Sequence, residues 1–302
     1  MRRHRSWIHP ALLVAIVSAV AAGCGDDTRR PEARPAASSQ ATEPVATPER
    51  SKPSAPVREG GAIVRSPEND ALFVADEDHS VVRRVPLPVD VSTPATEIAM
   101  PGRPAQVLAL ADRLLVTIRD PGLLLVLRKD GTEIARTALP ADAWGIAVTP
   151  DETMALVSSA WTHTVTAIDL ETAAVRWALD VAREPRGVVI APDGGSAYVI
   201  HLVGTAVTKI VGIGGAAPTV SSVALPVAPL RARWNGGDDV AASLGYAAVL
   251  DPEGTRLYVA RHALGALGPS AWFGASTVDV LLPHGDQPFA PRRTSPAFQS
   301  AP

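Results

Sequence analysis

The sequence predicts an all-β protein that is built from a repeated four-stranded unit. After residue 60 one short strand pattern recurs five times, and its shared valines are Val74, Val116, Val157, Val199 and Val259. The spacings between these valines are 42, 41, 42 and 60 residues, so the last is one period plus an insertion of 18. Turn residues recur between short stretches in which β-branched residues alternate with others. This alternation is typical of strands and excludes helical repeats of similar period. Four antiparallel strands per unit of roughly 42 residues indicate the blades of a β-propeller.

Each unit is expected to run through its four strands in order. A short apolar first strand, such as residues 145–148, precedes a tight turn and then the strand with the shared valine. A third alternating strand follows, as in residues 164–169, and a turn then leads to a fourth, as in residues 133–139. In four of the five units the first turn opens with a proline seven residues before the valine: Pro67, Pro150, Pro192 and Pro252. The second unit has a shorter turn at residues 111–113 and lacks this proline.

The best-conforming segments are PRGVVIAPDGGSAYV at residues 185–199 and TVTAIDL at residues 164–170. This pattern resembles the YVTN β-propeller repeat family, and the resemblance covers about residues 61–285. Members usually have seven blades, so the resemblance implies that the five recognised here form an incomplete propeller. The Pro-rich and Gly-rich segment from Pro283 onward offers no convincing fourth strand for the last blade, and residues 286–302 are expected to be an irregular tail.

Some relatives in that family carry a cytochrome c peroxidase-like haem domain after the propeller. No Cys-x-x-Cys-His motif occurs in this chain, which excludes a c-type haem on it. The resemblance therefore implies no cofactor here, but it does imply a possible protein partner such as a separate cytochrome.

The first 23 residues have the three parts of a bacterial signal peptide. Arginines at positions 2, 3 and 5 precede an apolar run at residues 11–22, and Ala21-Ala22-Gly23 leads directly to Cys24. The junction resembles the lipobox of bacterial lipoproteins, in which the cysteine becomes the acylated N-terminus. Cys24 is the only cysteine in the chain, which argues against a chance match. We expect Cys24 to carry lipid, including palmitate-type acyl chains, and to attach the protein to a membrane.

Residues 24–60 are rich in Pro, Ala, Ser and charge, and they are expected to form a disordered tether between the lipid and the propeller. The chain as a whole carries a formal charge of −3, and no basic stripe indicates nucleic-acid binding. Gly25 stands where Asp would, by analogy with enterobacterial lipoproteins, retain the protein in the inner membrane. The predicted location is the cell envelope, with the outer membrane or the periplasmic side favoured.

One face of the predicted propeller collects polar and aromatic residues. Loops between the second and third strands and loops between blades emerge on this face, and the Pro-Asp-Gly turns emerge on the other. Loops on a rigid scaffold are frequent sites of function. The candidate ligand or partner face consists of His79, His163, His201, His262, Arg103, Trp144, Arg186, Trp234 and Trp272. Two insertions, at residues 228–244 and 261–275, are expected to be loops on the same side.

Other interpretations of these residues are weaker but stay open. The histidines could bind a metal ion, although their positions on separate blades do not define a shared centre, so we predict no metal site. Asp76-Glu77-Asp78 could bind calcium, but a solvated acidic turn is favoured. We find no catalytic motif, so a non-enzymatic protein is expected.

Three functions follow from these observations. The favoured one is a membrane-anchored propeller that serves as a binding or docking module at the cell envelope. The first alternative is a propeller enzyme of the lactonase-like or dehydrogenase-like type, which would place charged residues at the starts of first strands, as Arg103 and Arg186 are. The second alternative is a structural surface protein.

Overall fold

A computed structural model describes residues 58–225, 242–267, 271–283 and 293–296 of the chain. The expected signal peptide, Cys24 and most of the expected tether lie outside these residues. Within the described ranges no helix has the length and apolar content that a membrane crossing requires.

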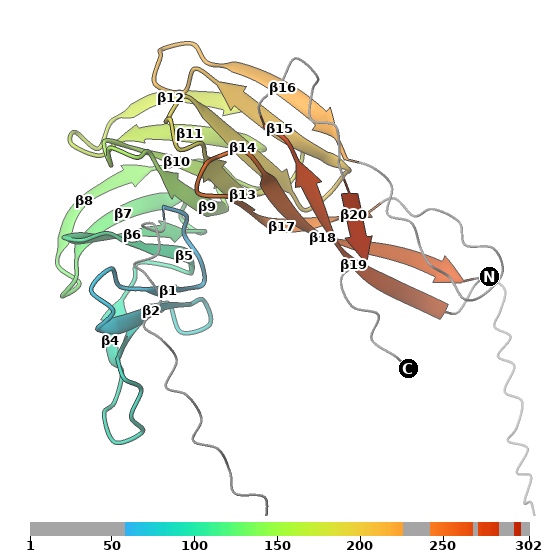
Figure 1. Ribbon diagram of the computed structural model, residues 1–302. Helices are drawn as coiled ribbons and strands as arrows, with labels where there is room; N and C mark the ends of the chain where they lie inside the picture. The colour runs from blue at the N-terminus through green and yellow to red at the C-terminus, as the bar shows by residue number, and fades with distance from the viewer. Residues whose placement is uncertain (1–57, 226–241, 268–270, 284–292, 297–302) are drawn as a thin grey trace, which may run out of the picture. The chain divides into compact units, whose positions relative to one another are not determined.

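The strands in these ranges form five four-stranded antiparallel sheets, each a simple meander in chain order (Figure 1). The first strands are β1 (Ile63–Arg65), β5 (Pro104–Ala109), β9 (Ala143–Val148), β13 (Pro185–Ile190) and β17 (Ala242–Leu250). The second strands are β2 (Ala71–Asp76), β6 (Arg113–Ile118), β10 (Met154–Ser159), β14 (Ser196–His201) and β18 (Leu257–Leu267). The third strands are β3 (Val81–Pro86), β7 (Leu123–Arg128), β11 (Thr164–Asp169), β15 (Ala206–Val211) and β19 (Ala271–Leu281). The fourth strands are β4 (Thr96–Ala99), β8 (Glu133–Ala138), β12 (Val175–Asp180), β16 (Thr219–Ala224) and β20 (Arg293–Pro296).

First strands of consecutive sheets lie next to one another, and fourth strands form the outer edges. This arrangement is that of blades in a β-propeller, and it confirms the predicted fold class. All five shared valines lie in second strands, as the repeat predicted.

The proline turns share one backbone geometry. In each, the amide of the fourth residue donates a hydrogen bond of 2.9 to 3.0 Å to the carbonyl of the first. The fourth residues are Asn69, Glu152, Gly194 and Gly254, and their φ angles lie between 55° and 69°. Glycine adopts this left-handed conformation without the steric penalty of a Cβ, and asparagine tolerates it better than most residues. The turn between the first and second strands is therefore stabilised by the same hydrogen bond and backbone conformation in each of these four units.

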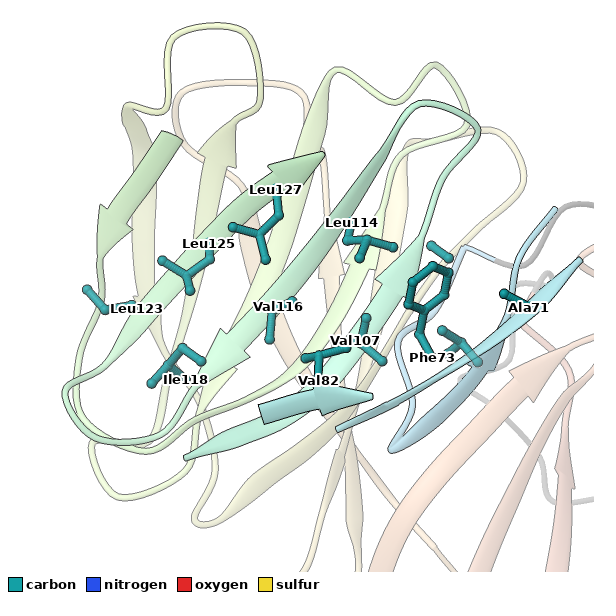
Figure 2. Close-up of a cluster of buried hydrophobic side chains, with 12 residues drawn as sticks. Ala71, Phe73, Val82, Val107, Leu114, Val116, Ile118, Leu123, Leu125 and Leu127 are labelled. Atoms are coloured by element: carbon teal, nitrogen blue, oxygen red, sulfur yellow. The ribbon is translucent and has the colours of Figure 1, made fainter. Parts of the chain in front are cut away.

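Four clusters of buried apolar side chains join consecutive blades. In the first, Phe73 from β2 meets Val107 from β5 and Leu114 and Val116 from β6 (Figure 2). In the last, Tyr198 from β14 belongs to the same cluster as residues of β18 and β19. Because successive strand residues point to opposite faces, each inner blade supplies one cluster with one face and the next cluster with the other. Burial of these faces is the main source of stability in such a stack.

Just before the first blade, the chain pairs with β5 of the second blade and β9 of the third blade. The amide of Gly60 donates to the carbonyl of Ile146 at 2.8 Å, and Gly61 exchanges two hydrogen bonds with Val107. A Cβ at position 60 would overlap the Ile146 side chain, so glycine permits this close approach. Burial raises the pKa of the neighbouring Glu59, which lies beside Ala147. Residues 58–61 thus tie three blades together.

The fifth blade differs from the sequence expectation in three ways. Residues 242–244 were expected to end a loop insertion, but they begin β17. Residues 261–275 were expected to be a loop insertion, but β18 continues to Leu267 and pairs along its length with β19, which begins at Ala271, as a long hairpin. The segment after Pro283 was expected to lack a fourth strand, yet β20 pairs with β19 between Val280 and Thr277. Alanine and glycine are frequent in the hairpin, so its apolar alternation is weak in the sequence. The hairpin is held by backbone hydrogen bonds between β18 and β19, which the side-chain pattern does not predict.

Candidate functional site

Loops of two kinds meet on one face of the propeller, as the geometry of the repeat predicts. The Arg119 amide, after β6, donates to the carbonyl of Arg103, before β5, at 2.9 Å. The Asp142 amide, before β9, donates to the carbonyl of Arg119 at 2.9 Å, and the Leu202 amide, after β14, donates to the carbonyl of Glu184 at 2.8 Å. These bonds link each blade-to-blade loop to a loop between second and third strands.

A cluster of charged groups around one indole lies on this face, and we call it the Trp144 site. Its members come from four blades: Glu77, Arg103, Arg119, Asp142, Trp144, Glu184 and Arg186. The guanidinium carbons of Arg119 and Arg186 lie 4.5 Å and 4.0 Å from the centroid of the Trp144 ring. Each contact is a cation–π interaction, and such contacts strengthen as the cation is removed from water.

Carboxylates connect the arginines into a continuous ladder of ion pairs. Arg119 pairs with both Glu77 and Asp142, and its Nε lies 2.5 Å from Asp142 Oδ1. Glu77 extends the ladder to Arg103 at 3.5 Å. On the other side, Arg186 lies 3.7 Å from Asp142 Oδ2 and 2.9 Å from Glu184. Burial opposes the charge of Arg119, but the bonds from Asp142 and Glu77 outweigh it and raise the arginine's pKa.

The ladder runs from the interior to the surface. The Asp142 side chain is 2% exposed and that of Arg186 is 9% exposed, whereas that of Arg103 is 47% exposed. Three carboxylates balance three guanidinium groups, as buried charges require. Of the three arginines, Arg103 is the most exposed and Arg186 the least.

The backbone under the Trp144 site is fixed by the second strands of the preceding blades. The Thr117 hydroxyl donates to the carbonyl of Trp144 at 2.7 Å, and the Ser158 hydroxyl donates to the carbonyl of Arg186 at 2.8 Å. Gly145 packs directly against that Arg186 carbonyl. A Cβ at position 145 would overlap the carbonyl oxygen, so this close packing requires glycine. The absence of a side chain at position 145 is what brings β9 and β13 close enough for Arg186 to stack on Trp144.

Some polar atoms at the centre of the site have no hydrogen-bond partner among the described residues. They are Nε and Nη1 of Arg186 and Oδ2 of Asp142. These atoms are themselves buried, and Nη1 of Arg186 lies 3.7 Å from Oδ2 of Asp142 in an ion pair. At these atoms the charges are therefore compensated by the ion pair and not by hydrogen bonds.

The four predicted histidines differ in burial and in their contacts. His79 is exposed, and its Nδ1 lies 2.9 Å from Asp76 Oδ1. Hydrogen bonds from Arg83, and to a smaller extent from His79, hold the pKa of Asp76 well below its usual range. His163 is half-buried after β10, and His262 is half-buried within β18. His201 is buried, with Nδ1 3.0 Å from the Arg183 carbonyl and Nε2 2.8 Å from the Thr208 hydroxyl.

Those two contacts define the state of His201. A carbonyl can only accept, so Nδ1 carries the proton and Nε2 accepts from the hydroxyl. Burial also lowers the pKa of His201, which favours the neutral ring. These contacts are those of a structural histidine.

The remaining predicted residues fall in different places. Arg103, Trp144 and Arg186 come together in the Trp144 site. Trp234 lies outside the described residues, and Trp272 lies in β19 opposite Ala266. Glu77 of the acidic turn contacts arginines, and no group of three or more His, Cys, Asp or Glu that could hold a metal is found among the described residues.

Sequence reasoning missed Arg119, Asp142 and Glu184 as site residues. Asp142 and Glu184 both stand fifteen residues before the shared valine of their unit, two before Trp144 and Arg186 respectively. Both adopt a left-handed backbone, with φ of 62° and 50°. Alignment of the units at this position could have found the two carboxylates. Arg119 follows the second strand of a different unit, and no spacing signals its contact with Trp144.

Comparison with known proteins supports the fold alone. No protein-family model matches the chain, and no curated protein matches it. Hydrazine synthase from Kuenenia stuttgartiensis is similar in structure, with a TM-score of 0.59 and 16% identity over 78% of this chain. A functionally unknown protein from Desulfotomaculum acetoxidans has a TM-score of 0.57 and 15% identity over 78% of this chain. The chain spans 66% and 69% of the lengths of these two structures, respectively.

Proposed function

We propose that this protein is a lipid-anchored binding module of the bacterial cell envelope, and that it docks a protein partner at the Trp144 site. The observation that carries the proposal is the pair of arginines, Arg119 and Arg186, stacked on Trp144 in a cluster that reaches the surface at Arg103. A carboxylate of the partner would pair with the exposed guanidinium of Arg103. Charged groups in a partly desolvated setting bind more strongly than the same groups on an open surface.

The arrangement suits recognition because its parts are already in place. Trp144 is held at its carbonyl by Thr117, and ion pairs orient both stacked arginines. Side chains fixed before binding lose little conformational entropy on association. Aromatic residues and arginines are also the side chains that contribute most to protein interfaces. Arg103, nearly half exposed, would set the orientation at the rim.

The resemblance to propellers that accompany haem domains points to a redox protein as the partner. Acidic surface groups on a separate cytochrome would meet Arg103. Lipid on Cys24 would keep the propeller close to such a partner at the membrane, which raises their effective concentration.

A capture experiment tests this function. The immobilised full chain is incubated with a membrane extract of the source cells, and bound proteins are quantified together with the haem absorbance of the eluate. We expect at least one protein to be retained by the wild type and lost from Arg186→Gln and Trp144→Leu. Ile134→Glu, a change at an exposed position of β8, is the matched control and should retain it. Identical capture by all four proteins would contradict the proposal.

The enzyme alternative has its own outcome in the same set of proteins. Turnover of a lactone by the wild type that is lost in Asp142→Asn would replace the docking function with a catalytic one. No turnover together with selective capture supports the docking module.

A further inference from the structure

Each blade has two apolar faces, and the inner blades bury both. We call the face that packs against the preceding blade the front face and the face that packs against the following blade the back face. In every internal junction a back face meets the next front face. The four clusters described above are four copies of this one contact.

The front face of the first blade is not covered in the same way. Ile63 pairs with Val74 in the position that Val107, Ile146 and Val188 occupy in the next three blades. Those three residues are at most 3% exposed, whereas Ile63 is 61% exposed. Val74 and Leu72 of β2 are half-buried on the same face, although the equivalent Val116, Val157 and Val199 are fully buried. The first blade therefore presents an apolar front face to solvent.

The back face of the fifth blade is exposed as well. Val249 pairs with Tyr258 in the position of Leu108, Ala147 and Val189. Those residues are at most 1% exposed, whereas Val249 is 56% exposed. Tyr258 is half-buried, and its equivalent Tyr198 is 1% exposed. If the fifth blade covered the first, Ile63 and Val249 would be buried like their equivalents. The two end faces are thus both available to another molecule.

We propose that a second copy of this chain covers these faces, with the back face of the fifth blade of one copy packed on the front face of the first blade of the other. The argument is continuity with the internal junctions, because the chain already makes this back-to-front contact four times. The two end faces are the remaining halves of that same contact. Exposed apolar sheet faces of this kind favour association.

The contact is heterologous, because the two surfaces that meet are different. This property gives a test that an ordinary symmetric dimer would fail. A charge at Ile63 blocks only the front face, and a charge at Val249 blocks only the back face. Two proteins that are each blocked at one face therefore retain one intact pair of complementary faces between them.

The experiment is sedimentation velocity on the purified full chain in one detergent over a range of concentrations. We expect the wild type to self-associate and Ile63→Glu or Val249→Glu to weaken this about tenfold or more, since either change places a charge in an apolar contact. An equimolar mixture of the two variants should form a dimer. Ile134→Glu, which changes a residue that is 53% exposed on β8, should associate like the wild type.

Each other result overturns the inference. A wild type that stays monomeric at every concentration shows that a second copy does not cover these faces. Association that survives both substitutions places the contact elsewhere, and a mixture that stays monomeric excludes the back-to-front geometry. Circular dichroism checks that each variant is folded, and Ile63→Ser with Val249→Ser provides a second, milder pair. Selective capture at the Trp144 site is measured separately, so failure of one proposal is distinguishable from failure of the other.

Discussion

The guanidinium carbon of Arg186 lies 4.0 Å from the centre of the Trp144 ring, on adjacent inner strands of two blades. We expect the two side chains to be coupled by about 1 kcal/mol beyond their separate effects. A double-mutant cycle of Arg186→Gln and Trp144→Leu, measured by urea unfolding, gives this coupling. The control cycle combines Arg186→Gln with Trp161→Leu instead of Trp144→Leu. Because Trp161 is 61% exposed, the effects of these two substitutions on stability should be additive. Equal coupling in both cycles would refute the stacked arrangement.

Asp142 neutralises two arginines in the interior of the Trp144 site. Asparagine tolerates the left-handed backbone at this position, where φ is 62°. Asp142→Asn therefore removes the negative charge without adding backbone strain. We expect a loss of about 3 kcal/mol in the free energy of unfolding. The exposed Asp120→Asn is the control and should change stability by less than about 0.5 kcal/mol. A similar small effect at Asp142 would show that its charge is not needed.

Most of the fold follows from local sequence signals, and the site follows only in part. The shared valines and the proline turns are repeated in the chain, so the blades and their order could be predicted. Trp144 and Arg186 could be placed on one face from the same repeat. Asp142 and Glu184 share a position in their units, but the role of Arg119 depends on which loops of consecutive blades touch, and this contact across blades leaves no spacing in the sequence. The long hairpin of β18 and β19 was missed because its small residues do not alternate clearly.

His201 should make stability depend on pH. Burial lowers its pKa in the folded protein, so the unfolded chain binds more protons as the pH falls below about 6.5. The contribution of this residue to stability is therefore full above that pH and is lost as the solution becomes more acidic. We expect His201→Gln to lose less stability than the wild type between about pH 7.5 and pH 5.5. An equal loss of stability in the wild type and in His201→Gln over this range would contradict the prediction.

The turn at Gly194 tests the backbone of the repeat. Its φ is 69°, so Gly194→Ala should reduce the free energy of unfolding by about 1 kcal/mol. Gly214→Ala is the control, because a Cβ there has no heavy atom within 4 Å. Thermal unfolding of both variants checks this prediction, and a smaller loss at Gly194 than at Gly214 would argue against it.

Cys24 should determine the location of the protein. Acyl chains contribute about 0.8 kcal/mol per buried methylene, so their loss in Cys24→Ser should release the mature chain from the membrane fraction. Fractionation of cells followed by mass spectrometry of the N-terminal peptide measures both attachment and acylation. An unmodified Cys24 in a protein that still sediments with membranes would be inconsistent with a lipoprotein.

We expect the face bearing the Trp144 site to contact a partner, and site-specific photo-crosslinking in the source cells measures this contact. A photoreactive residue is placed at Arg103 on the rim of the site, and at Ile134 on β8 as the control. We expect a discrete crosslinked product from position 103 that disappears when Arg186→Gln is added, and none from position 134. The absence of any product from position 103, or one that persists with Arg186→Gln, would contradict it.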